Sequence, residues 1–358
     1  MPSGFELSPT TAGAYLRRRG VLPAEATPST RTLGGGVSNR VVEVRWEDGC
    51  LVVKQPLPNL AVEDDWPADV GRVHNEAAAA RVYADVIEES GLAARVPAVT
   101  FEDADEHVIA VECAPAGATM WKRELLEGHV DVDVARAVGD VLGAVHAASA
   151  GDADLRETFA SKRPFEQLRV SPYHRTTARR HPDVRDRILQ EADRVIDVDR
   201  VLVHGDYSPK NVLVDRTNPG ANTDADRDVD REASGHATPW ILDFEVAHWG
   251  DPAFDTAFMC NHLFIKAVHN HEQLSEYLVA AETFWDAYTQ LVPWDVEADT
   301  VVELAVLMLA RVDGKSPVEY VVEGPVADAL RTIAKRALLG GTDTLDGFAS
   351  LVREEGPR

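Results

Sequence analysis

The chain has 358 residues, 45% of them hydrophobic, which is enough for two domains or a two-lobed fold with a sizeable buried core. Its 60 acidic residues outnumber its 36 basic ones, and the formal net charge of -24 argues against nucleic acid or an anionic membrane as a partner. The chain shows neither a signal-peptide pattern nor an apolar run of membrane-spanning length, so we expect a cytoplasmic protein.

The cysteines and the basic residues add two expectations. Cys50, Cys113 and Cys260 are widely separated and form no CxxC pair, so we expect neither a disulfide framework nor a zinc site, and we interpret all three as small buried hydrophobes. Arginine predominates over lysine, and together with the acidic excess this suggests a salt-rich cytoplasm or a GC-rich genome.

The first predicted elements are a short helix and three strands. The helix begins at Ser8 or Thr10 and carries apolar residues at helical spacing. Within residues 31–55, alternating and β-branched segments flank the glycines at 34–36 and the turn at 47–49. This pattern predicts three antiparallel strands.

The glycine-rich turn between the first two strands is a candidate phosphate-binding loop. Gly35 and Gly36 would let backbone amides approach a phosphate, and Ser38 and Asn39 could add side-chain donors. The alternative is an ordinary hairpin turn, so the glycines alone do not decide the function.

Lys54 follows the apolar run LVV in the third predicted strand, where a kinase places the ammonium that binds the α- and β-phosphates. The next predicted helix, at 72–87, carries Glu76 in its first turns. We therefore predict an ion pair between Lys54 and Glu76. The alternatives are a surface lysine and a solvated acid favoured by the helix dipole.

The middle of the chain predicts two further strands and two helices. Residues 96–101 and 107–112 alternate as strands, and the chain then crosses through the segment ECAPAG. Helical spacing covers 130–148 and 183–198. His146, in the first of these helices, is interpreted as a core or capping histidine.

The segment VLVHGDYSPKNVLV, at 201–214, and the later segment WILDFE carry the strongest chemical signal. An acid five residues before an asparagine, followed by an aspartate at the end of a strand, is a phosphoryl-transfer pattern. In it Asp206 accepts the proton of the attacking hydroxyl, while Asn211 and Asp243 hold magnesium, which prefers oxygen ligands. His204 is interpreted as a loop-organising hydrogen-bonder, and Lys210 either reaches the γ-phosphate or is solvated. The alternative for the three polar residues is that they are solvated turn residues.

The rest of the chain is predicted to be a loop followed by helices. Residues 216–238 are polar and acidic and predict an extended disordered loop between two strands, and they lack the spacing of an EF-hand calcium loop. Asp251 and Asp255 are predicted to cap a helix and to brace the catalytic loop backbone. Helices are then predicted at 252–267, 272–291, 296–312 and 323–339.

HGDYSPKN, ILDFE and GDPAFD together resemble the catalytic core of the aminoglycoside phosphotransferase and choline kinase superfamily, whose fold is protein-kinase-like. The resemblance implies an α+β, two-lobed fold. Residues 1–112 would form a nucleotide-binding lobe on a small antiparallel sheet, and 113–358 a mainly helical catalytic and substrate-binding lobe. It also implies that the backbone of Glu112, Cys113 and Ala114 binds the adenine.

The first lobe is similar to the 5-methylthioribose kinase branch in KQPLP, in the pair Trp66-Pro67 and in Arg72 before the helix. The second lobe departs from that branch at SPKN and at DFE, where the branch carries DPE. The resemblance implies a pentose-like acceptor such as methylthioribose or a deoxysugar, with an aminoglycoside, choline or another amino alcohol as the alternative. Candidate acceptor-binding residues are Arg311, Lys315, Trp249 and His262; Arg311 can also be read as an ordinary cation at a helix C-terminus.

The sequence therefore predicts a small-molecule kinase that uses ATP and magnesium. A non-catalytic, kinase-like nucleotide-binding module is the alternative from another class, and the presence of all four of Lys54, Asp206, Asn211 and Asp243 speaks against it. A protein kinase is disfavoured because no APE-like segment follows DFE.

Overall fold

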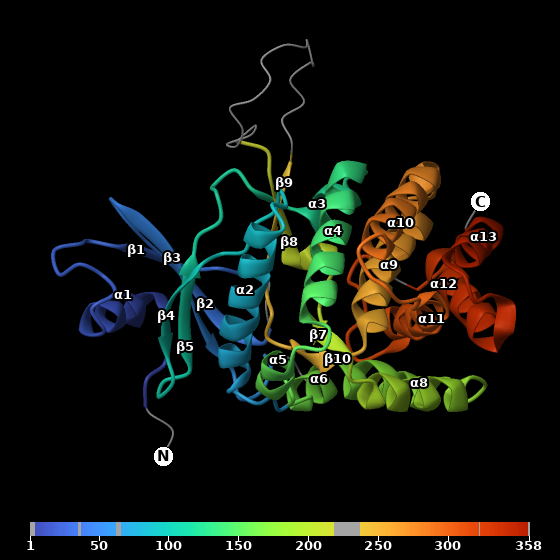
Figure 1. The fold of residues 1–358 in the computed structure, drawn as a ribbon, viewed down its shortest axis with the longest axis horizontal. Helices are drawn as coiled ribbons and strands as arrows, with labels where there is room; N and C mark the ends of the chain where they lie inside the picture. The colour runs from blue at the N-terminus through green and yellow to red at the C-terminus, as the bar shows by residue number, and fades with distance from the viewer. Residues whose placement is uncertain (1–3, 35–36, 62–65, 218–236, 322, 357–358) are drawn as a thin grey trace, which may run out of the picture.

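The computed structural model describes residues 4–34, 37–61, 66–217, 237–321 and 323–356 (Figure 1). It has the predicted α+β architecture, with an antiparallel sheet in the N-terminal part and a mainly helical remainder. Gly35, Gly36 and most of the predicted acidic loop at 216–238 lie outside the described residues. Within the described part of the chain, no helix is both long and apolar enough to cross a membrane.

The N-terminal part is built on a sheet in which five described strands follow the order β1-β2-β3-β5-β4, with every neighbouring pair antiparallel. Two helices cover its faces. The elements are α1 (Pro9–Arg18), β1 (Ser29–Thr32), β2 (Asn39–Trp46), β3 (Gly49–Pro56), α2 (Arg72–Glu89), β4 (Val99–Asp103) and β5 (Val108–Glu112). The predicted first helix, capped at Ser8, the three strands and the second helix are thus confirmed.

Alternation along the strands separates the two faces of this sheet. Val42, Val44 and Val53 pack with Tyr15 and other residues of α1 in one hydrophobic cluster. On the opposite face, a second cluster joins side chains of α2 to alternate residues of β5. Because side chains of a strand point alternately to opposite faces, the sheet can be covered by a helix on each side.

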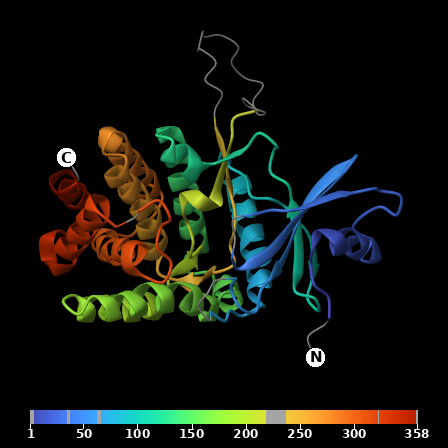
Figure 2. The ribbon, with the colours of Figure 1, turned by 180° about the vertical axis from the view of Figure 1, so that it is seen from behind.

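The C-terminal part is mainly helical, and its short strands lie between the N-terminal sheet and helices α9 to α13 (Figures 1 and 2). The short strands pair as β7 with β10 and in the order β6-β8-β9. The strands are β6 (Thr119–Met120), β7 (Val201–Val203), β8 (Val212–Asp215), β9 (Thr238–Ile241) and β10 (His248–Gly250). The longer helices are α4 (Val132–Ser149), α8 (Arg185–Asp197), α9 (Pro252–His269), α10 (Leu274–Thr289), α11 (Glu297–Asp313), α12 (Pro325–Arg336) and α13 (Leu345–Glu355).

The predicted long helices of this part are confirmed, with ends that differ by a few residues. Helix α13 was not predicted, and neither were several short helical segments. These are α3 (Trp121–Leu126), α5 (Ala153–Thr158), α6 (Arg163–Phe165), the π-helical segment Glu166–Arg175, α7 (Thr176–Arg180), the 3-10 turns Pro209–Asn211 and His271–Gln273, and the π-helical segment Ala337–Gly341. Short or π-helical segments carry little of the 3.6-residue periodicity from which helices are predicted.

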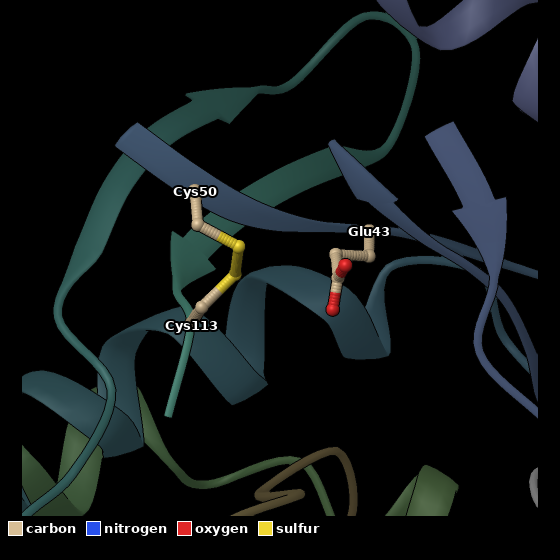
Figure 3. Close-up of side chains that lie close together, drawn as sticks. All are labelled: Glu43, Cys50 and Cys113. Carbon is tan, nitrogen blue, oxygen red and sulfur yellow. A yellow bond between two sulfur atoms is a disulfide. The ribbon is translucent and has the colours of Figure 1, made fainter. Parts of the chain in front are cut away.

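The prediction that the cysteines form no disulfide was wrong, because Cys50 and Cys113 are bonded (Figure 3). Strand β3 pairs with β5 so that Leu51 lies opposite Glu112, which places Cys50 and Cys113 side by side with Cα atoms 5.6 Å apart. That separation lies within the range for disulfides. The two residues are 63 positions apart, so only the strand register brings them together.

A carboxylate oxygen of Glu43 on β2 lies within 4.8 Å of both sulfurs of this disulfide (Figure 3). Its carboxylate accepts a hydrogen bond from Arg31, with Nη2 and Oε2 2.7 Å apart, and both sulfurs are bonded to each other. Glu43 is therefore occupied by its ion pair with Arg31, and the two cysteines are occupied by their covalent bond. Cys260 is buried in the core of the C-terminal part, as expected, and burial raises the pKa of its thiol.

Candidate active site

The loop between β7 and β8 carries Asp206 and Asn211 on buried side chains. Asn211 Nδ2 donates to Asp206 Oδ2 at 2.7 Å and to the Asp206 carbonyl oxygen at 3.0 Å. A turn of 3-10 helix between them brings the asparagine back over the aspartate. The two polar residues therefore form one unit, which a pair of solvated turn residues would not.

The backbone of this loop is held by Asp255 from α9. Its carboxylate accepts hydrogen bonds from the amides of His204 (2.6 Å) and Gly205 (2.8 Å), which confirms the predicted brace. Gly205 has φ of +78°, and a Cβ there would lie 2.7 Å from the carbonyl oxygen of Val246. Asp251 caps α9 as predicted, since its side chain accepts from the Ala253 amide.

His204 organises the loop rather than carrying a proton. Its Nε2 bonds the carbonyl oxygen of Leu242 at 3.1 Å, and its Nδ1 accepts from the Asp206 amide at 3.2 Å. The ring is fully buried, and burial lowers its pKa. The neutral His204 ring uses both nitrogens in hydrogen bonds. It thereby links the loop that carries Asp206 to the segment that carries Asp243.

Asp243 follows β9 and adopts a left-handed backbone with φ of 69°, which is rare for a residue other than glycine and recurs at functional sites. The neighbouring Leu242 amide donates to the Asn211 carbonyl oxygen at 2.9 Å, so Asp243 lies next to the catalytic loop. Burial raises the pKa of Asp243, but Lys54 and Lys210 outweigh it and the net pKa is lowered. The carboxylate is therefore ionised.

The predicted ion pair between Lys54 on β3 and Glu76 on α2 is confirmed. Lys54 Nζ also lies 3.8 Å from Asp243 Oδ1. Burial lowers the pKa of Lys54, but Glu76 and Asp243 outweigh it, so the ammonium stays charged. Burial raises the pKa of Glu76 to about 7 against the opposing effect of Lys54.

These groups border a cavity of about 450 Å³ between the two parts of the chain. The predicted adenine-binding segment, Glu112, Cys113 and Ala114, lines it together with Lys54, Glu76, Asp243 and apolar residues of β3, β5 and β8. An apolar cavity with a few convergent charged groups is typical of a small-molecule site.

Ser38 and Asn39, predicted as phosphate donors, are engaged in a different network. Asn39 Nδ2 donates to Glu245 Oε2 at 2.9 Å, and the Ser38 carbonyl oxygen accepts from Arg72. Arg72 is buried and its Nε donates to the same Glu245 oxygen at 3.0 Å. The side-chain amide of Asn39 therefore links the start of β2 to Glu245 in the DFE segment.

The predicted acceptor residues do not all lie together. Arg311, at the end of α11, donates from Nη1 to the Tyr173 hydroxyl at 3.1 Å, and His262 is buried on α9. Lys315 Nζ lies 4.7 Å from the centre of the Trp66 ring. Trp249 is buried in the main hydrophobic cluster, on β10, a strand whose three residues are all buried, and its role as an acceptor residue stays a prediction.

Two functional candidates were missed from the sequence. Arg169 Nη2 lies 3.0 Å from Asp206 Oδ2, and Glu245 forms the ion pair with Arg72. Arg169 lies in the π-helical segment, which has no periodic signal. Glu245 was in view as the last residue of DFE, and its buried position after Asp243 was the signal that could have found it.

A sheet and a helical part that share a cavity, a lysine–glutamate pair and an acidic loop are the features of a kinase-like phosphotransferase. The model of the phosphotransferase enzyme family matches residues 29–222, more than half of the chain, and the chain belongs to this family. It is accordingly a transferase. None of the curated proteins matches the chain significantly.

Solved structures to which the chain is similar include two enzymes and one member of a kinase family. Macrolide 2'-phosphotransferase MphH from Brachybacterium faecium is 19% identical, with 97% of this chain and 99% of that chain covered and a TM-score of 0.48. A choline/ethanolamine kinase family protein from Mesorhizobium loti is 19% identical, with 96% and 99% covered and a TM-score of 0.47. Choline kinase LicA from Streptococcus pneumoniae is 14% identical, with 92% and 98% covered and a TM-score of 0.47.

Proposed function

We propose that the protein is a small-molecule kinase that transfers the γ-phosphate of ATP to a hydroxyl group of its acceptor. The observation that carries the proposal is that Lys54, Glu76 and Asp243 line one cavity, next to the loop that carries the Asp206–Asn211 unit. Phosphoryl transfer is catalysed mainly by positioning and by neutralising charge on the phosphates. These residues supply a fixed cation, oxygen ligands for a metal and a carboxylate for the acceptor.

The nucleotide is proposed to bind between a nucleotide-binding lobe, residues 1–112, and a catalytic lobe, residues 113–358. Lys54 would bind the α- and β-phosphates while Glu76 holds its ammonium in place. The backbone at 112–114 lines the same cavity and would bind the adenine. We propose that Gly35 and Gly36, which lie outside the described residues, cover the phosphates.

The residues present fit magnesium. Asn211 and Asp243 offer amide and carboxylate oxygens, which are the ligands this ion prefers, and the lowered pKa of Asp243 keeps its carboxylate ionised. Bound magnesium would neutralise charge on the phosphates. The amide nitrogen of Asn211 donates to Asp206, so the amide oxygen of Asn211 would be the atom that binds the ion.

Asp206 would orient the acceptor hydroxyl and accept its proton. Its carboxylate is held by Asn211 and by Arg169, so it presents a fixed oxygen to the acceptor. Lys210 is exposed beside it, and attraction to Asp206 raises the pKa of that lysine. Lys210 therefore carries a charge that could meet the γ-phosphate.

For the acceptor, the first-lobe motif supports a pentose-like sugar, with choline or an aminoglycoside as the alternative. The motif residues themselves have structural partners. Trp66 Nε1 donates to the Gln167 carbonyl oxygen at 2.9 Å, and Arg72 pairs with Glu245. They hold the two lobes together, so the identity of the acceptor is decided by other side chains.

The proposal is tested by separating nucleotide binding from transfer. We expect magnesium and a non-hydrolysable ATP analogue to raise the thermal unfolding temperature only when added together, and Asp243→Asn to weaken this effect. With magnesium and ATP, wild-type protein should release ADP when an acceptor panel is added, and Asp206→Asn should bind nucleotide normally but lose this release.

Two results would overturn the proposal. If magnesium and nucleotide produce no stabilisation at low or high potassium chloride, the cavity is not a nucleotide site. If Asp206→Asn keeps the acceptor-dependent release of ADP, the carboxylate does not have the proposed role. Metal-independent nucleotide binding without transfer to any acceptor would favour the non-catalytic binding module.

A further inference from the structure

A series of cations and aromatic rings extends from Asp206 into the helical part of the chain. The Arg169 guanidinium, which pairs with Asp206, lies 5.7 Å from the centre of the Tyr173 ring and 5.8 Å from that of Phe258. The two rings are stacked with centres 6.1 Å apart. This first pair of rings therefore lies next to the guanidinium that pairs with the candidate base.

The series continues along α9 and α11. The Arg311 guanidinium lies 5.6 Å from the same tyrosine ring, and the His262 ring lies 5.4 Å from the phenylalanine ring. One turn further along α9, Lys266 Nζ lies 5.4 Å from the ring of Tyr320, and Lys122 Nζ lies 5.8 Å from that ring. We call the five basic residues Lys122, Arg169, Lys210, Lys266 and Arg311 the cation cluster.

Lys266 is fully buried, yet its hydrogen-bond partners among the described residues are neutral. Its Nζ donates to the His262 carbonyl oxygen at 3.1 Å and to the Tyr320 hydroxyl at 3.4 Å. No carboxylate lies within ion-pair distance of this nitrogen among the described residues. A buried ammonium without a counter-ion is costly, and an anion bound beside it would offset that cost.

Arg311 repeats the pattern. Its Nη1 donates to the Tyr173 hydroxyl and to the Ser316 carbonyl oxygen, both neutral, and its buried Nε has no hydrogen-bond partner in the described part of the chain. Among the described residues, the acids within ion-pair distance of the cation cluster are Asp206, on Arg169, and Glu319, on Lys122, while Asp243 attracts Lys210 and Arg169 from further away. The side chain of Glu319 is 67% exposed, so it leaves the interior positive.

The basic residues of the cation cluster affect the pKa of His262, which lies among them. Burial lowers its pKa well below the ordinary value, and Lys266, Arg311, Lys122 and Lys210 each lower it further. This grouping of basic side chains is unexpected in a chain with a net charge of -24. The chain has only seven lysines, and three of them belong to the cation cluster. A solvated acidic surface does not require such a cluster next to the catalytic loop.

We infer that the acceptor carries an anionic group, a carboxylate or a phosphate, together with the hydroxyl that is phosphorylated, and that Lys266, Arg311 and Lys122 bind this group. The inference rests on the proposed kinase function. Charge-assisted hydrogen bonds to carboxylate and phosphate are strong, and both groups suit lysine and arginine. Choline and aminoglycosides are cations, and like charges in a poorly solvated site repel them.

The inference is tested with pairs of related acceptors in which one member carries an anionic group and the other does not. The matched pairs are D-gluconate with D-glucose, D-glycerate with glycerol, and glycerol 3-phosphate with glycerol, with choline and kanamycin as cationic members. Binding of each compound is measured by titration calorimetry in the presence of magnesium and a non-hydrolysable ATP analogue, at constant ionic strength. ADP release with ATP is measured in parallel. The carboxylates and the phosphate distinguish the two sources of negative charge.

We expect an anionic member to bind more tightly than its neutral partner. In Lys266→Met this preference should fall about tenfold or more, since one charge-assisted hydrogen bond is lost. Nucleotide affinity should not change, because Lys266 is not among the residues that line the nucleotide cavity. Lys335→Met, which removes a partly exposed lysine that pairs with Asp183 on the surface, is the matched control and should keep the preference.

The outcomes separate the two proposals. Nucleotide binding with no preference for any anionic member, or a preference that survives in Lys266→Met, overturns the anionic acceptor and leaves the kinase standing. Preferred binding of choline or kanamycin has the same effect. Absence of magnesium-dependent nucleotide binding overturns the kinase itself and with it the inference.

Discussion

Replacing Lys266 with methionine is expected to stabilise the protein, and to do so more at pH 6 than at pH 9. Lys266 is fully buried on α9 and is held by a carbonyl oxygen and a hydroxyl rather than by a carboxylate. Methionine has a similar length and no charge, so it can fill the same space. The lost hydrogen bonds would cost about 1 kcal/mol, which the removal of a buried charge should exceed.

The magnitude follows from the pKa of the lysine. Burial, together with the charges of Lys122 and Arg311, lowers it from 10.5 to about 7, while Glu319 opposes them. The two values differ by about 3.5, which corresponds to a cost of roughly 5 kcal/mol for the charged amine in the folded state. Other titratable groups near the amine are His262 and His269, both on α9, and Tyr320, which follows α11.

The sign of the pH dependence is fixed by which state binds the proton. Below about pH 7 the amine is charged in both states, so the full cost of roughly 5 kcal/mol is present. Between about pH 7 and 10.5 the unfolded chain binds a proton that the folded protein has released, so the cost falls as the pH rises. At pH 9 roughly 2 kcal/mol remains. The advantage of the variant should therefore shrink by roughly 3 kcal/mol between pH 6 and pH 9.

The measurement is urea unfolding at pH 6, 7.5 and 9, at one fixed concentration of potassium chloride, followed by tryptophan fluorescence. Lys335→Met is the control and should differ little from wild type at each pH, because its ion pair is partly exposed. If Lys266→Met is no more stable than wild type at pH 6, or if its advantage grows with pH, the amine is not an uncompensated buried charge and the reasoning fails.

Three other substitutions test the framework of the site. Gly205→Ala should lower the free energy of unfolding by about 1–3 kcal/mol, because φ is +78° there and the new Cβ would lie 2.7 Å from a carbonyl oxygen; an unchanged urea midpoint would contradict this. Glu245→Gln should cost about 3 kcal/mol because it leaves buried Arg72 without its ion pair, and adding Arg72→Met should recover part of the loss; equal losses in the single and double variants would argue against coupling. Cys50→Ser should cost about 4 kcal/mol, because the disulfide joins positions 63 residues apart, and dithiothreitol should destabilise wild type but not the variant; three titratable thiols in the unreduced, unfolded protein would refute the bond.

Several features of the site could be predicted because each lies within one short segment or between neighbouring elements. The Asp206–Asn211 unit is contained in one loop, where five positions and a 3-10 turn suffice to bring the two side chains together. The Lys54–Glu76 pair joins a strand to the next helix along the chain, and a helix that packs on a sheet directs its first turns toward it. The roles of these residues in catalysis stay predictions.

Other features depended on contacts between distant segments. The disulfide follows from the register of β3 with β5, which the sequence does not indicate. Arg169 meets Asp206 only because a π-helical segment without periodic signal crosses the loop. In each case the residue type was visible in the sequence and its partner was not.

The amino-acid sequence by itself determined the chemistry, because the order of acid, asparagine and second acid on neighbouring strands is a local pattern that survives any arrangement of the remaining helices. Only the tertiary structure decided that basic side chains from distant segments lie close together. Lys122, Lys266 and Arg311 come from α3, α9 and α11, and nothing in their spacing relates them. Their interaction arises because electrostatic energy depends on distance and burial, which are properties of the folded chain.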